Sequence, residues 1–164
     1  MILPDVLGAG LRIVFCGTAV GEKSAKRRCY YAGPGNQFWP ILKKFGLIPE
    51  SFRPEEFRKL TTYGLGLTDL VKFRSGNDAK LRSDNFDVIG FKKKMVSFAP
   101  KVLAFNGKKA AEIFFSRSVE YGLQNEKIES TRIFVLPSTS GAACGYWNEN
   151  QWAKLAKRFT KTVR

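Results

Sequence analysis

Four short runs of apolar residues, each followed by a polar turn or one containing Gly or Pro, divide the chain. They occupy residues 11–16, 68–71, 102–105 and 133–136. The first run contains mainly β-branched, aliphatic and aromatic residues and stops at Gly17, which is typical of a strand buried on both faces of a parallel sheet. The pattern therefore predicts a short, mainly parallel four-stranded sheet.

Helical spacing of apolar residues fills much of the sequence between these runs. Apolar positions recur every three or four residues from Val88 to Phe98, which predicts a helix that ends before Pro100. Further helices are predicted over residues 38–45, 108–115 and 152–163. Strands that alternate with helices indicate an α/β fold, which we expect to be a three-layer α/β/α sandwich in one domain spanning residues 1–164.

The loops that follow the predicted strands form the predicted site, because ligands of such folds bind beyond the carboxyl ends of parallel strands. These loops cover residues 17–35, 69–83, 106–109 and 137–147. The first loop combines glycines and basic residues with Tyr31 and leads to Asn36. Glycine lets backbone amides approach a ligand, an aromatic ring can stack on a nucleobase, and an amide can hydrogen-bond to its edge.

Charge narrows the class of partner. The chain has 28 Lys and Arg against 14 Asp and Glu, a net charge of +14, which indicates a polyanionic partner. It contains no apolar run of about 18 residues and no signal-peptide pattern. We therefore expect a cytoplasmic protein without a membrane partner, associated with the nucleoid through DNA.

Histidine is absent from the sequence, which excludes Ser-His and Cys-His nucleophile pairs and leaves metal binding to carboxylates. Cys16, Cys29 and Cys144 are too scattered for a zinc or iron–sulfur site, and we expect them to be reduced thiols. The sequence thus predicts neither a metal nor a cofactor. Catalysis would depend on Asn, Asp, Thr, Tyr or backbone amides.

Four motifs follow one another along nearly the whole chain. They are residues 17–21 with Tyr31 and the P-x-N-x-F-W stretch 34–39, the Y-G-x-G-x-T stretch 63–68, F-N-G-K at 105–108, and L-P with a Ser-rich turn at 136–143. In type and order they resemble the motifs of the mismatch-specific uracil and thymine DNA glycosylases of the uracil-DNA glycosylase superfamily. The resemblance implies a monofunctional glycosylase that removes uracil, or another deaminated base, from DNA and leaves an abasic site.

The first motif departs from the family pattern at its third position. The family has G-I-N-P-G, whose Asn positions the attacking water, whereas this chain has Ala19, which can neither orient nor activate water. Relatives that excise hypoxanthine also lack that Asn, and the resemblance of this chain to them implies that Asn36 positions the water. Alternatively, Asp69 holds the water as a general base or stabilises the oxocarbenium-like sugar. Asp69 could also be structural, as a helix cap or in an ion pair with Lys72 or Arg74.

The predicted base pocket combines side chains with backbone amides. Tyr31 would stack on the base while the Asn36 amide pairs with its edge. Amides near Thr18 and Ala19 would hold the carbonyl oxygen of the departing base. Asn106 belongs to the same predicted pocket, although it could instead cap the following helix, and Asn36 could simply stabilise its loop.

DNA contacts are expected from the basic loops and from the Ser-rich turn. The predicted DNA-binding residues are Lys23, Arg27, Arg28, Arg74, Lys108, Ser138, Ser140, Gly141 and Ala142. In the resembling family the turn inserts a larger side chain into the gap left by the base, at the position of Ala142. The expected partner is DNA containing uracil or another deaminated base, bound by a monomer.

Two further hypotheses remain open at this point. The protein could bind damaged or abasic DNA without cutting it. It could also be a generic nucleotide-binding α/β protein, although residues 17–21 lack the ending of a P-loop and the spacing of a dinucleotide fingerprint.

Overall fold

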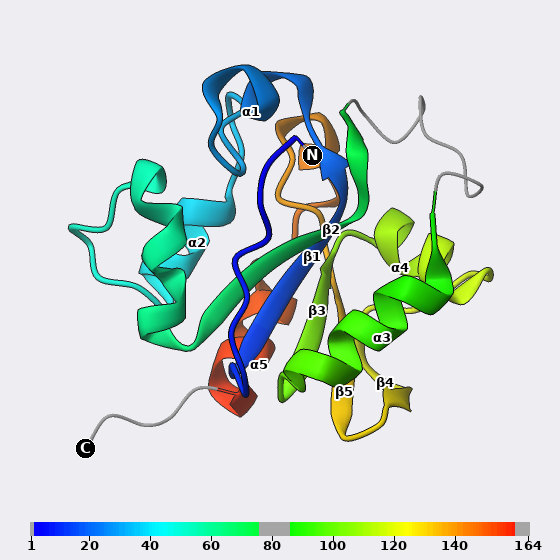
Figure 1. The fold of residues 1–164 in the computed structure, drawn as a ribbon. Helices are drawn as coiled ribbons and strands as arrows, with labels where there is room; N and C mark the ends of the chain where they lie inside the picture. Colours follow the sequence, from blue (N-terminus) through cyan, green and yellow to red (C-terminus); the bar gives the residue numbers. More distant parts are fainter. Residues whose placement is uncertain (1, 76–85, 160–164) are drawn as a thin grey trace.

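A single sheet forms the centre of the computed structural model, which describes residues 2–75 and 86–159 (Figure 1). Its strands are β1 (Ile13–Val20), β2 (Leu65–Ser75), β3 (Val102–Asn106), β4 (Gly122–Ile128) and β5 (Thr131–Leu136). They lie in the order β2-β1-β3-β5-β4. β1 pairs in parallel with β2 and β3, and β3 with β5, whereas β4 is antiparallel to β5.

Helices cover both faces of this sheet, as the predicted α/β/α sandwich requires. The α-helices are α1 (Glu22–Arg27), α2 (Phe38–Lys44), α3 (Val88–Phe98), α4 (Lys108–Phe115) and α5 (Glu149–Phe159), and η1 (Pro54–Tyr63) is a 3₁₀ helix. In Figure 1, α2, η1 and α5 lie on one side of the sheet, and α3 and α4 on the other. The three-layer architecture and both bounds of α3 and α4 are therefore confirmed.

Two aromatic-rich clusters explain which helix faces turn inward. On one face of the sheet, Phe15 packs edge-on against Phe38 at 5.2 Å between ring centroids and stacks on Trp152 at 5.6 Å. On the other face, Phe105 lies 5.3 Å from Phe114, with Met95 fully buried beside them. The apolar stripe of each helix thus meets the sheet, which provides most of the stabilisation of such short helices.

The predicted sheet was wrong in one strand and in several bounds. β4 was missed because it is an edge strand whose sequence is largely polar and whose middle residues are exposed. β1 extends beyond its apolar run, since Gly17 pairs with Asp69 and Ala19 with Val71, and β2 extends beyond its run at both ends, to Leu65 and Ser75. Residues 17–20 of the first motif therefore lie on a strand rather than in a loop. The helix predicted over residues 152–163 begins earlier, at Glu149, and residues 160–163 lie outside the described residues.

The N-terminal segment pairs with the outer edge of β2, which would otherwise be exposed. Val6 and Leu67 exchange backbone hydrogen bonds of 2.9 and 2.8 Å, and the amide of Ile2 donates to the carbonyl oxygen of Lys72 at 3.1 Å. Covering an edge in this way removes an unpaired row of backbone groups. None of the described helices is long and apolar enough to cross a membrane.

Gly66, on β2, lies where the N-terminal segment packs against the strand, so a substitution there tests how closely the two fit. A Cβ atom there would lie 2.6 Å from the backbone oxygen of Val6 and 2.8 Å from Cδ1 of Leu11. We expect Gly66→Ala to lower the free energy of unfolding by about 1–3 kcal/mol in urea titrations, because this side of the strand is already filled. The control is Gly33→Ala, since a Cβ at Gly33 meets nothing within 4 Å. Equal stability of the two variants would contradict this account of the edge.

Candidate functional site

The loops beyond the carboxyl ends of β1, β3 and β5 lie against one another. The amide of Gln37 donates to the carbonyl oxygen of Thr139 at 2.8 Å. Gly141 approaches the neighbouring loop so closely that a Cβ there would lie 2.6 Å from the oxygen of Pro34. In Figure 1, α1 and the orange segment that contains Gly141 lie at the same end of the sheet. The predicted convergence is therefore observed for these three loops, whereas residues 69–75 of the fourth predicted loop belong to β2 and residues 76–83 lie outside the described residues.

Asn106, at the end of β3, connects these loops. Its Nδ2 donates to Oγ1 of Thr139 at 2.9 Å, and its Oδ1 accepts from the amide of Thr139 at 3.0 Å. The residue at the N-cap of α4 is Gly107, so the side chain of Asn106 does not cap that helix. Its amide instead fixes the Ser-rich turn relative to the sheet.

Tyr31 belongs to the loop after α1, and its hydroxyl lies close to Gly17 on β1. Its backbone has φ of 55°, a conformation that is unusual for a tyrosine, and its ring stacks on Phe38 with centroids 4.0 Å apart. Among the described residues its buried hydroxyl has no hydrogen-bond partner. Burial, followed by the negative charge of Asp69, raises the pKa of Tyr31, and the nearby Asn106 amide opposes this rise. An unpartnered buried hydroxyl indicates a position that a water or ligand can complete.

Asp69 is buried next to Tyr31, with only 3% of its surface exposed. Its partner on β1 is Gly17, and a Cβ at Gly17 would lie 3.0 Å from Oδ1 of Asp69 and 3.6 Å from the hydroxyl of Tyr31. Burial raises the pKa of Asp69, and the ammonium of Lys72 opposes the rise. The absence of a side chain at Gly17 thus leaves room for a carboxylate and a hydroxyl on the same side of the strand.

Asp69 also belongs to a cluster of ionic groups. Its Oδ2 accepts from Nζ of Lys72 at 3.3 Å, so the ion pair considered from the sequence is present. The same Nζ lies 2.9 Å from Oδ1 of Asp5, and Lys94 lies 2.8 Å from the other oxygen of Asp5. Burial acts to raise the pKa of Asp5, but Lys94 and Lys72 outweigh it and the pKa is lowered.

The sequence interpretation missed Asp5 and Lys94. Asp5 lies in the N-terminal segment, outside every predicted loop. Lys94 belongs to a run of three lysines that is typical of a solvated helix face. One signal was available, because Lys94 follows the buried Phe91 by three positions and so lies next to the buried side of α3.

Three other predicted base-pocket residues make hydrogen bonds or packing contacts within the fold. Oδ1 of Asn36 accepts from the amide of Phe38 at 2.9 Å, which is the loop-stabilising bond considered as its alternative role. Thr18 is buried within β1. Ala19 packs against the cluster on the α3 and α4 side of the sheet, so its methyl group contributes to packing there.

The basic residues predicted to bind DNA differ in their exposure. Lys23 and Arg27 are exposed on α1, and the exposed Arg28 ends that helix with φ of 53°. Nη1 of Arg27 donates to the carbonyl oxygen of Ala32 at 3.1 Å. Lys108 is half-buried, with its ammonium 4.3 Å from the ring centroid of Tyr121. The backbone of Arg74 lies within β2, and its side chain is outside the described part of the structure.

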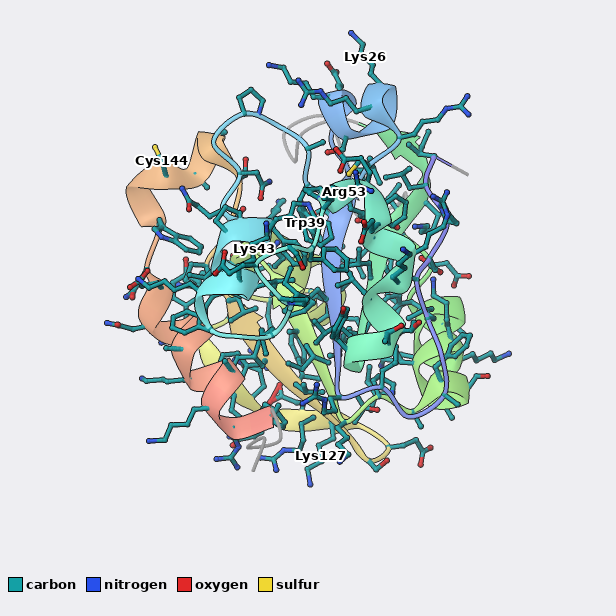
Figure 2. The ribbon with its side chains drawn as sticks, turned by 90° about the vertical axis from the view of Figure 1, so that its left-hand side faces the viewer. Lys26, Trp39, Lys43, Arg53, Lys127 and Cys144 are labelled. Carbon is teal, nitrogen blue, oxygen red and sulfur yellow. The ribbon has the colours of Figure 1, made fainter. Side chains whose placement is uncertain are left out.

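The Ser-rich turn has an internal hydrogen-bond pattern. Oγ of Ser138 accepts from the amide of Ser140, and Oγ of Ser140 accepts from the amide of Ala142, each at 3.2 Å. Both serine protons stay available to donate, since a hydroxyl can accept and donate together. Ala142 is exposed directly after the close approach of Gly141. Figure 2 shows Cys144, from the same segment, far from Lys127 at the opposite end of the sheet.

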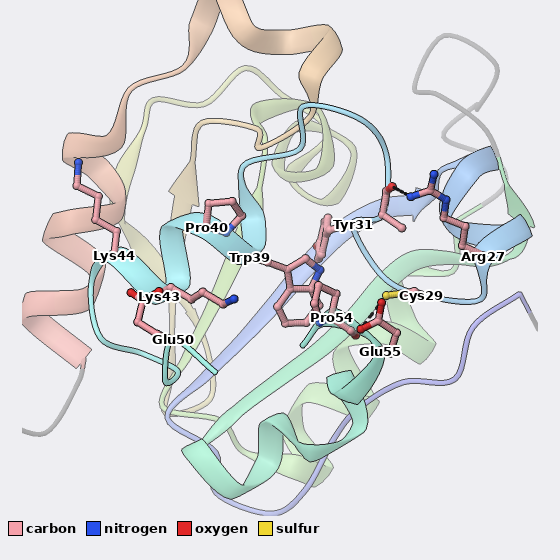
Figure 3. A pocket seen from close by; sticks show the side chains of 11 residues that line it. Arg27, Cys29, Tyr31, Trp39, Pro40, Lys43, Lys44, Glu50, Pro54 and Glu55 are labelled. Atoms are coloured by element: carbon pink, nitrogen blue, oxygen red, sulfur yellow. Dashed lines mark hydrogen bonds between the residues drawn. The ribbon is translucent and has the colours of Figure 1, made fainter. Parts of the chain in front are cut away.

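A cleft of about 770 Å³ opens on the flank of these loops, between α1, α2 and η1 (Figure 3). It is lined by Arg27, Cys29, Tyr31, Ala32, Trp39, Pro40, Lys43, Lys44, Glu50, Pro54 and Glu55. Tyr31 is thus common to the cleft and to the group around Gly17, whereas Asn36, Asp69 and Asn106 do not line the cleft. Within the described residues, no three Asp, Glu or Cys side chains gather as possible metal ligands.

Comparison with known proteins gives two consistent results. The family model of the uracil DNA glycosylase superfamily matches residues 4–159. The fold is similar to the solution NMR structure of a candidate uracil DNA glycosylase from Methanosarcina acetivorans, with a TM-score of 0.64 and 25% sequence identity. That similarity covers 96% of this chain and 94% of the other.

Asn106 provides a direct test of how the loops are held together. We expect Asn106→Ala to reduce stability by about 1–3 kcal/mol, because it leaves the buried amide of Thr139 without its acceptor. Amide hydrogen exchange at Thr139 should accelerate together with the loss of stability. The control is Asn125→Ala, since Asn125 is exposed on β4. Unchanged exchange at Thr139 would show that other contacts hold the turn.

Proposed function

Because the chain belongs to the uracil DNA glycosylase superfamily, we propose that it is a monofunctional DNA-repair glycosylase of the mismatch-specific type. It would hydrolyse the N-glycosidic bond of uracil, or of another deaminated base, in DNA and leave an abasic site. The observation that supports this proposal is the carboxylate of Asp69, buried beside Gly17 and Tyr31 where the loops of the sheet converge.

In this proposal Asp69 acts on the sugar and the water. As the bond breaks, its electron pair leaves with the base, and the sugar becomes an oxocarbenium-like cation that a nearby carboxylate stabilises. Water then adds to the sugar carbon, and the carboxylate accepts the released proton. The raised pKa of Asp69 suits a general base, because a stronger base accepts a proton more readily.

Asn36 has a different role in the proposal. Its side-chain oxygen already accepts from the amide of Phe38 at the start of α2. That oxygen keeps a second lone pair, so the bond orients the side chain of Asn36 without excluding a water. We assign Asn36 to holding the loop that presents Tyr31, because this is the bond that it makes, and Asp69 to the reacting water, because a carboxylate can accept a proton and an amide cannot.

Tyr31 would recognise the base from the side of the cleft. Phe38 covers one face of its ring, while Tyr31 itself lines the cleft, so a base can approach it from there. The backbone amides near Thr18 and Ala19 would hold the oxygen of the departing base anion, which needs no side chain at position 19. The exposed Lys23, in the first turn of α1, and the exposed Arg28, at its C-terminal end, would contact phosphates.

Incubation with a uracil-containing oligonucleotide, followed by alkali, tests the activity itself. We expect strand breaks at the uracil position, because an abasic site is cleaved by alkali, and binding that weakens steeply with salt. An identical oligonucleotide with thymine in place of uracil is the control. Unbroken DNA at excess protein, with a clear gel shift for the uracil strand, would instead support a binder of damaged DNA that does not cut.

The substitution Asp69→Asn separates the two candidate groups for the water. It keeps the shape of the side chain and removes its charge, so we expect single-turnover excision to fall by roughly a hundredfold or more while DNA binding is retained. Asn36→Ala should reduce excision less and should lower the melting temperature through the lost bond to Phe38. A larger loss of rate in Asn36→Ala than in Asp69→Asn would show that Asn36, and not Asp69, holds the reacting water.

A further inference from the structure

We infer that Lys72 is the positioning residue for Asp69, holding it as a correctly oriented carboxylate, and that Asp5 makes the N-terminal segment part of the candidate site. The inference rests on the proposed function, in which Asp69 acts on the water. The geometry that supports it involves a lysine, two carboxylates and a tyrosine from three separate stretches of the chain.

The ammonium of Lys72 is fully engaged. Its Nζ lies 2.9 Å from Oδ1 of Asp5, 3.3 Å from Oδ2 of Asp69, and donates to the hydroxyl of Tyr30 at 3.1 Å. An ammonium group has three hydrogens to donate, and here three acceptors surround it. Only 10% of the Lys72 side chain is exposed, so these contacts replace water.

This contact fixes the rotation of the Asp69 carboxylate. Lys72 binds Oδ2, which leaves Oδ1 as the oxygen next to Gly17, on the side where the Tyr31 hydroxyl lies. Without the ammonium, the carboxylate plane could rotate out of this orientation. The lysine therefore keeps one oxygen of Asp69 directed towards the proposed position of the water.

Asp5 holds Lys72 from the outer edge of the sheet. Its Oδ1 also accepts from Oγ1 of Thr68 at 2.8 Å, and its Oδ2 pairs with Lys94. Backbone pairing of the adjacent Val6 with Leu67 keeps Asp5 at this place. Asp5 and Asp69 balance Lys72 and Lys94 in charge, which is the condition under which buried ions are tolerated.

Lys72 is the main charge that favours ionised Asp69. The titratable and charged groups around Asp69 are Lys72 on the same strand, Asp5 in the N-terminal segment, Tyr30 and Tyr31 in the loop after α1, Cys16 on β1 and Lys94 on α3. Burial raises the pKa of Asp69 most, and the charge and hydrogen bond of Lys72 oppose it most. Removing that charge leaves only the hydrogen bond of Tyr30 to oppose burial, so the pKa of Asp69 must rise further.

A carboxylate titration followed by ¹³C NMR tests the inference without any catalysis. We expect Lys72→Met to raise the pKa of Asp69 by roughly 1–3 units relative to the unsubstituted protein. Lys94→Met is the matched control, because Lys94 contacts the same Asp5 but not Asp69, and it should shift Asp69 far less. Equal shifts in both variants, or none in Lys72→Met, would overturn the inference. If Lys72→Met does not fold, Lys72→Gln removes the charge and keeps a hydrogen-bonding group.

The pH dependence of excision provides the functional measurement. A base with a raised pKa works only above that pKa, so the acid limb of the single-turnover rate should move to higher pH in Lys72→Met and return towards its original position in Lys72→Arg. Lys94→Met should leave the acid limb nearly in place. A pKa shift without excision by the unsubstituted protein would refute the proposed function alone. Excision with an unmoved acid limb and an unmoved pKa would refute the role of Lys72 alone.

Discussion

The ionic cluster around Lys72 constrains much of the rest of the structure. A buried ammonium is stable only when its hydrogens meet acceptors and nearby negative charges balance it. Here those acceptors come from the N-terminal segment, from β2 and from the loop after α1. Packing at the edge of the sheet and the arrangement of Asp69 are therefore coupled, although the atoms concerned are far apart in sequence.

Burial of Asp69 has opposing effects on folding and on the proposed chemistry. Desolvation raises its pKa, which makes the ionised form costly in the folded protein. The same exclusion of water strengthens the interaction of a carboxylate with a sugar cation. Gly17 makes the arrangement possible, since any side chain there would crowd Oδ1 of Asp69. Local stability is thus lower at the place where a charge is most effective.

The sequence predicted the parts of the fold that depend on local patterns. Apolar runs marked the four parallel strands, and helical periodicity gave α3 and α4 with their bounds. It could not give β4, because an edge strand with solvent on one side needs few apolar residues. Nor could it give the contact of Asp5 with Lys94, whose positions are 89 residues apart, because tertiary pairing of ions leaves no periodic signal.

The position of Ala19 shows why motif order and chemistry must be argued separately. Residues 17–20 of the first motif lie on β1, and there the methyl group of Ala19 packs on the α3 and α4 side of the sheet. Parallel pairing brings Asp69 beside Gly17 on the neighbouring strand. In the proposed mechanism the reacting polar group therefore comes from Asp69 on β2, beside Gly17, and not from position 19 of the first motif. The order of the motifs shows which strands meet at this end of the sheet, whereas the chemistry depends on which of these strands carries a polar side chain there.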